Sequence, residues 1–108
     1  MAKAISLTLE IINGVYDGLS YNMGPSATSL SIGRAPDNEV SIPFESMASR
    51  SHAQIVKEGD SFYLIDQKSM NGSFLNESKV VDRINIYSDD IVRIGNTKFR
   101  CILKQIDA

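Results

Sequence analysis

Apolar and polar residues alternate along most of this chain. In segment 5–11 (ISLTLEI), isoleucine and leucine are separated by serine, threonine and glutamate. This period of two places alternate side chains on opposite faces of an extended chain, so the segment predicts a half-buried strand. The same pattern predicts strands at 29–33, 53–57, 62–66, 91–94 and 97–103, and shorter strands near 19–23, 39–42, 73–75 and 83–86.

Turn-forming residues separate these segments. Asn-Gly, Asp-Gly, Gly-Pro and Gly-Asn pairs recur between them, mostly eight to twelve residues apart. Short strands at this spacing, without a long window of helical period, are typical of sandwiches and barrels. The pattern therefore predicts an all-β fold of two packed antiparallel sheets, with the functional residues in its loops.

Length and charge narrow the class of protein. A chain of 108 residues with 43% hydrophobic and 22% charged residues fits one globular domain. The net charge of −2 and pI near 5.3 argue against a nucleic-acid partner, because such binding depends on extended basic patches. An anion site, if present, is expected to be local.

Several features predict a cytoplasmic protein without a membrane partner. Residues 1–10 alternate in polarity and contain no signal-type apolar stretch. No run approaches the roughly 18 apolar residues that a spanning helix requires. The single cysteine, Cys101, cannot form an intramolecular disulfide, which suits a reducing compartment. It alternates in phase with Phe99 and Leu103, so we expect it in the core.

Three short clusters contain residues suited to anion or peptide binding. A Gly-Arg pair, Gly33–Arg34, ends a predicted strand; segment 49–52 (SRSH) precedes another strand; and segment 71–76 (NGSFLN) follows a loop. Each cluster alone is more simply interpreted as a turn, since Asn-Gly is an ordinary hairpin dipeptide and serine is common in loops.

Taken together, the clusters resemble the forkhead-associated (FHA) domain family, whose pattern is Gly-Arg, Ser-x-x-His and Asn-Gly-x-x-x-Asn in this order. Segments 33–42 (GRAPDNEVSI) and 90–95 (DIVRIG) extend the resemblance, which covers about residues 5–104. It implies that residues 1–108 form a single FHA domain, an eleven-stranded antiparallel β-sandwich (FHA/SMAD-like) with its functional loops at one end. It also implies a module that binds phosphothreonine in a partner protein.

The resemblance assigns the phosphate to three residues. A phosphothreonine carries nearly two negative charges and three acceptor oxygens, which suit a guanidinium fork and neutral donors. Arg34 matches the family residue that pairs with the phosphate, Ser49 the hydroxyl that donates to it, and Arg50 a second phosphate contact. Gly33 is expected to permit an unusual backbone dihedral that projects Arg34 into the loops.

The other matching positions hold the peptide or support the site. Asn71 matches the residue whose amide clamps the peptide main chain. His52 is expected to brace the binding loops from beneath without touching the ligand. Gly72 is expected to permit a tight turn, and Asn76 to support its loop through local hydrogen bonds.

One position departs from the family pattern. Met70 stands where the family frequently has a threonine or serine that adds a hydroxyl contact to the phosphate. The missing hydroxyl contact is expected to cost about 0.5–1.5 kcal/mol of binding free energy, unless the main-chain N–H of Met70 contributes instead. Preference for residues after the phosphothreonine is assigned to loops 43–47 and 76–83, with Phe44, Glu45 and Arg83 as candidates.

Two other functions remain as alternatives. An enzyme would need His52 with Ser49 or Ser51 as nucleophile and Asp66 as orienter, but no nucleophile-elbow motif is present. One histidine and one cysteine do not supply a typical zinc site, so neither a metal nor a cofactor is expected. The stronger alternative is an FHA-like scaffold that assembles proteins independently of phosphorylation. The preferred function implies an upstream Ser/Thr kinase that produces the ligand.

Overall fold

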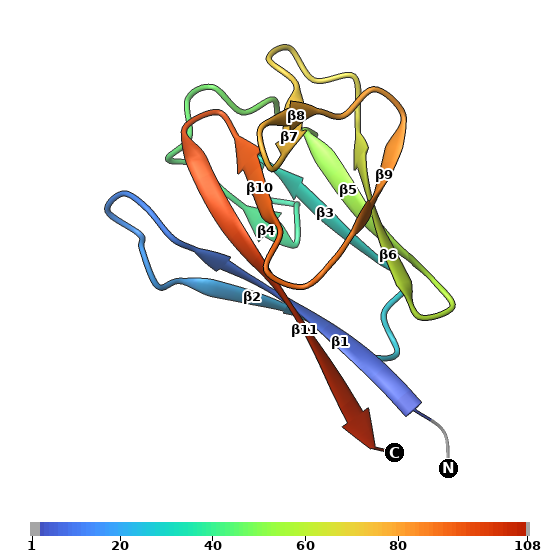
Figure 1. The fold of residues 1–108 in the computed structure, drawn as a ribbon. Helices are drawn as coiled ribbons and strands as arrows, with labels where there is room; N and C mark the ends of the chain where they lie inside the picture. The colour runs from blue at the N-terminus through green and yellow to red at the C-terminus, as the bar shows by residue number, and fades with distance from the viewer. Residues whose placement is uncertain (1–2, 108) are drawn as a thin grey trace.

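The computed structural model describes residues 3–107, and this part of the chain consists of strands and loops without a helix (Figure 1). None of the described residues therefore forms a helix able to cross a membrane. The eleven strands are β1 (Lys3–Ile11), β2 (Ser20–Met23), β3 (Ser29–Gly33), β4 (Val40–Ser41), β5 (Ala53–Glu58), β6 (Ser61–Asp66), β7 (Ser73–Leu75), β8 (Ser78–Lys79), β9 (Arg83–Ile86), β10 (Ile91–Ile94) and β11 (Thr97–Asp107).

The strands form two sheets that pack as a sandwich. One sheet has six strands in the order β2-β1-β11-β10-β7-β8, and the other has five in the order β4-β3-β5-β6-β9. The predicted eleven-stranded all-β sandwich is confirmed. One pairing differs from the expected antiparallel arrangement: β3 and β4 are parallel, with Ile32 opposite Val40. The connection between them must therefore reverse direction and return, which creates the loop that carries Arg34.

The alternating pattern predicted ten of the eleven strands. The missing one, β8, contains only two residues, and both are exposed, so it has no apolar alternation to detect. Strand β11 continues to Asp107, beyond the predicted end at 103, because it pairs with the whole of β1. The core consists of the inward-facing side chains of both sheets, together with the loop residues Ile42, Ala48 and Val80.

Cys101 lies in this core, as its phase in β11 predicts. Its side chain is fully buried. Burial, together with the charge of Asp90, raises the pKa of the Cys101 thiol to about 12. A thiol with such a pKa is not a nucleophile at neutral pH, so this residue has a packing role.

Strand register places several loops at one end of the sandwich. Ala53 at the start of β5 lies opposite Ile32 near the end of β3 and opposite Asp66 at the end of β6. The segments that follow β3, precede β5 and follow β6 are therefore neighbours. The β4–β5 and β6–β7 loops lie at the upper end of Figure 1, together with the β10–β11 turn, whereas the start of β1 and the end of β11 lie at the lower end.

Candidate functional site

Main-chain hydrogen bonds join the β3–β4 and β4–β5 loops. The N–H of Arg34 donates to the carbonyl of Ser49 at 3.0 Å, and the N–H of Ala35 donates to the carbonyl of Arg50 at 3.2 Å. Asn38 reinforces this contact, because its Nδ2 donates to the Arg50 carbonyl at 2.8 Å and to the Ala35 carbonyl at 2.9 Å. The two cationic residues are therefore held on adjacent main-chain segments.

Gly33 has a different role from the one expected. Its φ angle does not lie in the left-handed region, so no unusual dihedral requires glycine here. Instead, a Cβ at this position would overlap the carbonyl group of Arg50 and would lie 2.8 Å from Nδ2 of Asn38. The absent side chain is what allows the β4–β5 loop to approach the end of β3.

We predict that Gly33→Ala destabilises the domain by about 1–3 kcal/mol, the usual cost of inserting a methylene into a packed site. The overlapping atoms are main-chain atoms of Arg50, which cannot move as a flexible side chain would. Urea denaturation measures the loss. Gly24→Ala is a suitable control, since a Cβ there would have no neighbour within 4 Å. Equal stability of the two variants would contradict the steric explanation.

The Arg34 side chain is exposed at this junction. Its Nε donates to the carbonyl of Ala48 at 3.1 Å, which directs the guanidinium along the β4–β5 loop. Among residues 3–107, no carboxylate forms an ion pair with it, whereas Arg83 and Arg93 are each paired with a glutamate. The terminal guanidinium nitrogens therefore remain available to an anion.

Ser49 links this arginine loop to the β6–β7 loop. Its Oγ accepts a hydrogen bond from the main-chain N–H of Met70 at 3.0 Å. The hydroxyl hydrogen has no acceptor among the described residues, so Ser49 can still donate to a ligand. The Met70 N–H, expected as a substitute phosphate donor, is already used in this contact. The Met70 side chain is 87% exposed.

Asn71 and Arg50 complete the exposed part of the site. Nδ2 of Asn71 donates to the carbonyl of Met47 at 2.9 Å, so the β6–β7 loop is tied to the β4–β5 loop a second time. The amide oxygen and second amide hydrogen of Asn71 have no partner among residues 3–107 and remain for a ligand. The Arg50 side chain is exposed and forms no ion pair within the described chain.

His52 lies beneath these loops and is fully buried. Its Nδ1 accepts from the N–H of Ser49 at 2.9 Å, which requires the proton to be on Nε2. Nε2 then donates to the carbonyl of Gly72 at 2.9 Å. The imidazole thus connects the main chain of the β4–β5 loop to that of the β6–β7 loop.

Asp66 organises the β6–β7 loop from the end of β6. Its Oδ1 accepts from the hydroxyls of Ser69 at 2.6 Å and Ser73 at 2.7 Å, and its Oδ2 accepts from the N–H of Ser69 at 3.0 Å. Burial raises the pKa of Asp66, but the hydrogen bonds from Ser69 and Ser73 outweigh it, and the net pKa is lowered. The Asp-x-x-Ser spacing is a turn signal from which this role was predictable.

We predict that Asp66 stabilises the domain in its ionised form. Because its pKa is lower when folded than the ordinary value of 3.8, the unfolded state binds the proton more readily. This contribution is fully present well above pH 4 and is lost as the pH falls through the folded pKa. Asp66→Asn should therefore cost roughly 1–3 kcal/mol at pH 7, and less near pH 3, in urea denaturation. A cost that does not change with pH would contradict this assignment.

Two further predicted residues occupy turns. Gly72 has a φ of 87°, in the left-handed region that favours glycine, between Asn71 and β7. Asn76 starts the β7–β8 turn, where both it and Glu77 have positive φ. Its side chain accepts from the N–H of Ile91 at 2.9 Å and donates to Asp90 at 3.0 Å. The expected local hydrogen bonds are therefore replaced by contacts with β10 and the residue before it.

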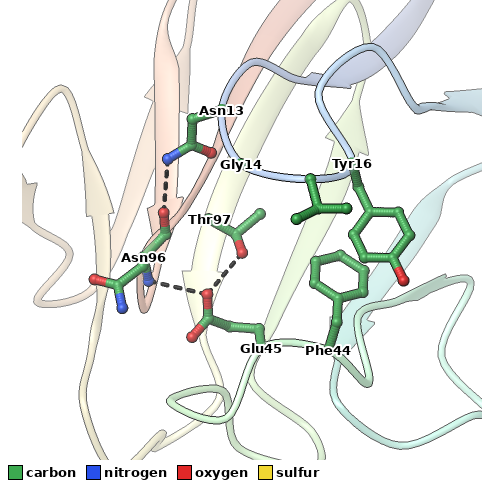
Figure 2. A pocket seen from close by; sticks show the side chains of 8 residues that line it. Asn13, Gly14, Tyr16, Phe44, Glu45, Asn96 and Thr97 are labelled. Carbon is green, nitrogen blue, oxygen red and sulfur yellow. Dashed lines mark hydrogen bonds between the residues drawn. The ribbon is translucent and has the colours of Figure 1, made fainter.

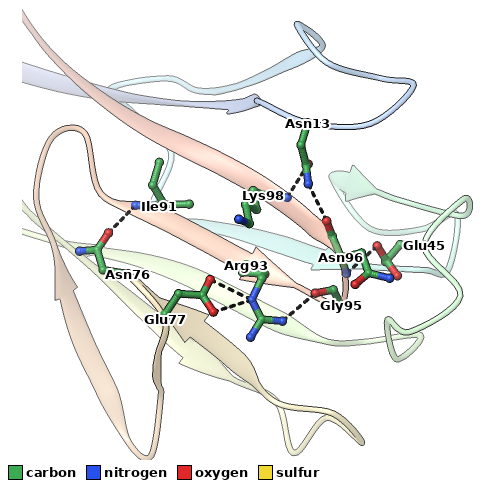
Figure 3. A network of polar contacts seen from close by, with 9 residues as sticks. All are labelled: Asn13, Glu45, Asn76, Glu77, Ile91, Arg93, Gly95, Asn96 and Lys98. Carbon is green, nitrogen blue, oxygen red and sulfur yellow. Dashed lines mark hydrogen bonds and ion pairs between the residues drawn. The ribbon is translucent and has the colours of Figure 1, made fainter.

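Two of the residues proposed for peptide preference, Glu45 and Arg83, are engaged in contacts within the domain. Glu45 is only 6% exposed, and its carboxylate accepts hydrogen bonds from the N–H of Asn96, the N–H of Met47 and the hydroxyl of Thr97. It anchors the β4–β5 loop on the β10–β11 turn and does not face solvent. Arg83 stacks on Tyr63 and pairs with Glu58 at the β5–β6 turn. Figure 3 shows the hydrogen bond between Glu45 and Asn96.

Comparison with known proteins agrees with this geometry. The family model described as FHA domain matches residues 30–95, which include every residue of the three contacting loops. The chain belongs to the FHA domain family. Its membership is consistent with the expected order of Gly-Arg, Ser-x-x-His and Asn-Gly clusters, which the structure brings to one end of the sandwich.

Relatives of this FHA domain occur within longer proteins. The ABC transporter ATP-binding/permease protein Rv1747 of Mycobacterium tuberculosis is 43% identical over 65 residues, which are 60% of this chain and 7% of that protein. The glycogen accumulation regulator GarA of Mycolicibacterium smegmatis is 36% identical over 97 residues, which are 90% of this chain and 58% of GarA. The chain therefore spans less than two thirds of each relative.

A solved structure supports the same fold. An FHA domain studied for phosphothreonine-dependent interactions superposes with a TM-score of 0.79 at 28% identity. The superposition covers 90% of this chain and 95% of the solved chain. FHA domains are interaction modules, so the exposed polar groups at this end are candidates for contact with a partner protein.

Proposed function

We propose that this FHA domain binds a phosphothreonine-containing segment of a partner protein through the loop end described above. The observation that carries the proposal is the Arg34 guanidinium, which is exposed, has no carboxylate partner among residues 3–107, and is attached by its main chain to the carbonyl of Ser49. A doubly charged phosphate fits such a group, because a guanidinium can donate two parallel hydrogen bonds to it.

The remaining contacts follow from the donors that are free. The Ser49 hydroxyl would donate to a second phosphate oxygen while its Oγ keeps the hydrogen bond from Met70. Arg50 would add charge from the exposed side of the loop. Asn71 would use its amide oxygen and second amide hydrogen on the peptide main chain, which fixes the direction and register of the peptide.

The supporting residues explain how these donors are held ready. His52 bridges the Ser49 and Gly72 main chains, and Asp66 holds the turn before Met70 through Ser69. Such preformed loops reduce the entropy that binding must overcome. Met70 supplies no hydroxyl, and its N–H is engaged with Ser49, so the affinity is expected to be about 0.5–1.5 kcal/mol weaker than with a hydroxyl-bearing residue.

An enzymatic role has no support in the site. The imidazole of His52 uses Nδ1 to accept from the Ser49 N–H and Nε2 to donate to Gly72, so neither nitrogen faces a serine hydroxyl. Asp66 is bonded to Ser69 and Ser73 and does not orient the histidine. We infer that the domain is a binding module acting in the cytoplasm on the product of a Ser/Thr kinase.

A second candidate function is phosphorylation-independent assembly of a complex. Met70 favours this function, because it places an exposed apolar side chain beside the site, at a position where a hydroxyl would contact a phosphate. This scaffold would keep its partner after phosphatase treatment, whereas the phosphothreonine module would release it. The two functions thus make opposite predictions for one treatment.

A peptide library tests the proposal. We expect phosphothreonine peptides to be enriched over the same library after phosphatase treatment, with dissociation constants on the order of micromolar, about −8 kcal/mol. Phosphoserine versions should bind more weakly by about 0.8 kcal/mol if the additional methyl is buried. Equal recovery from the phosphorylated and dephosphorylated libraries would reject phosphate recognition and favour the scaffold.

A further inference from the structure

Cationic side chains gather on the outer face of the six-stranded sheet. In β11, Cys101 lies opposite Leu9 in the core, so residues 98, 100, 102 and 104 face away from the core. The register of the neighbouring strands places Arg93 of β10, Phe74 of β7 and Lys79 of β8 on the same outer side. We call this surface the basic face. Its cations are Lys79, Arg93, Lys98, Arg100 and Lys104.

Few carboxylates balance the cations of the basic face. Glu10 lies opposite Arg100, and Glu77 in the β7–β8 turn pairs with Arg93 at 2.9 Å. Among the side chains of residues 4–106, the other four cations form no ion pair. Residues 89 and 90, both aspartates, border the face in the β9–β10 loop. Five cations against two carboxylates give the face a charge of +3, so the remainder of the chain carries −5 of the total of −2.

The positive charge of this face acts on its own carboxylate. Nε of Arg93 donates to both oxygens of Glu77, at 3.0 and 2.9 Å (Figure 3). These hydrogen bonds lower the pKa of Glu77, and the charges of Arg93 and Lys98 lower it further. The face therefore stabilises a negative charge placed against it.

The turn that joins β10 to β11 is fixed by its neighbours. Nδ2 of Asn13 donates to the carbonyl of Asn96 at 2.8 Å (Figure 2), and Oδ1 of Asn13 accepts from the N–H of Lys98 at 3.0 Å (Figure 3). Nη1 of Arg93 donates to the carbonyl of Gly95 at 2.8 Å. The main chain that carries the cations is thus preformed, and binding would order only side chains.

The spacing of the β11 cations suits an extended peptide. Alternate residues of a strand repeat every 6.8 Å or so, and β11 presents Lys98, Arg100 and Lys104 over about 20 Å. The partly exposed Ile102 occupies the outward position between Arg100 and Lys104. An extended peptide has the same repeat, so it could place acidic side chains against the cations and one apolar side chain against Ile102.

A short acidic segment fits this face better than an extended polyanion. Charges interact strongly only within a Debye length of about 8 Å at physiological salt. A short segment would meet mainly the +3 of the face, whereas a nucleic-acid duplex or an anionic membrane would also approach the −5 of the remainder. Stacking of unpaired bases is not favoured, because the Arg93 guanidinium covers the Phe74 ring, with Cζ 4.2 Å from its centroid.

We propose that the basic face is a docking surface for a short acidic segment of a partner protein, with glutamate or aspartate facing the β11 cations. This inference goes beyond the proposed function and does not depend on it, because Arg34, Ser49 and Asn71 lie in loops and not on this face. Surface charges of this kind speed the encounter and orient the partner more than they add affinity. The acidic segment needs no phosphate.

NMR titration of the domain with the peptide Glu-Ser-Glu-Ser-Leu-Ser-Glu at low salt tests this surface. We expect amide shift changes on β10 and β11, and little change with the peptide that has glutamine in place of glutamate. Lys98→Glu combined with Lys104→Glu should weaken binding by about fivefold or more, and the corresponding glutamine pair by less. Lys68→Glu combined with Arg83→Glu is the matched control, which has the same net charge but lies off the face and should weaken binding by less than about twofold.

Three results would overturn the proposal. Equal losses in the two double glutamate variants would indicate general attraction to the chain. Shift changes concentrated at Arg34 and Ser49 would place the acidic peptide in the phosphate site. Binding of single-stranded oligothymidylate or of phosphatidylglycerol vesicles, without binding of the peptide, would identify another class of partner. Failure of phosphothreonine peptides to bind would instead overturn the proposed function alone.

Discussion

Replacement of Arg34 by alanine is expected to weaken phosphothreonine-peptide binding by about 10- to 150-fold, equivalent to about 1.5–3 kcal/mol for hydrogen bonds to a charged group. Arg34 has no ion-pair partner in the described chain, and its side chain makes one hydrogen bond, to the partly buried carbonyl of Ala48. The unfolding free energy should therefore change little. Calorimetric titration of a binding phosphopeptide measures the loss.

Two further variants separate the guanidinium fork from charge alone. Arg34→Lys should recover only part of the affinity, because an ammonium cannot form the planar pair of hydrogen bonds. Arg83→Ala removes a cation that is paired with Glu58 outside the loop cluster, and it should leave the affinity within about twofold. Equal losses in the Arg34 and Arg83 variants would indicate general electrostatic attraction instead of a phosphate site.

Replacement of His52 by alanine is expected to have the largest effect on stability, about 3 kcal/mol or more. The side chain is completely buried, so its removal leaves a cavity. It also leaves the N–H of Ser49 and the carbonyl of Gly72 without their partners, at a cost of about 1–3 kcal/mol for each buried group. Urea denaturation at neutral pH measures the change in unfolding free energy.

The control for this variant is Met70→Ala, which truncates a side chain that is 87% exposed in the loop joined to Ser49. Its unfolding free energy should stay within about 0.5 kcal/mol of the wild-type value. If His52→Ala were as stable as Met70→Ala, the imidazole could not be a structural bridge. Chemical shifts of loop amides in the folded His52 variant would then show whether the loops still meet.

The strands were predictable because burial repeats every second residue. The segment from Leu7 to Ile11 is an example, because every second side chain in it is buried in the core. The alternation of apolar and polar residues therefore shows which face of the strand is buried. The loop cluster was predictable in part from residue types, because Arg34, Ser49 and Asn71 have donors suited to a phosphopeptide. Their meeting at one end depends on strand register, which the pattern alone does not specify.

Other features depend on contacts between distant segments. Gly33 is required by the approach of the Arg50 carbonyl, whereas its sequence context led us to expect an unusual backbone dihedral. Glu45 appeared to be an exposed loop residue, but the β10–β11 turn supplies hydrogen bonds that satisfy its buried carboxylate. The engagement of the Met70 N–H by Ser49 likewise follows from tertiary packing. No local propensity predicts such contacts.

The structure of the domain bound to a phosphothreonine peptide tests the central claim most directly. The phosphate should lie within hydrogen-bonding distance of the Arg34 guanidinium and the Ser49 hydroxyl, with Asn71 contacting the adjacent peptide main chain. A phosphate bound at another surface, with Arg34 contacting only the Ala48 carbonyl as it does in the free domain, would contradict the account.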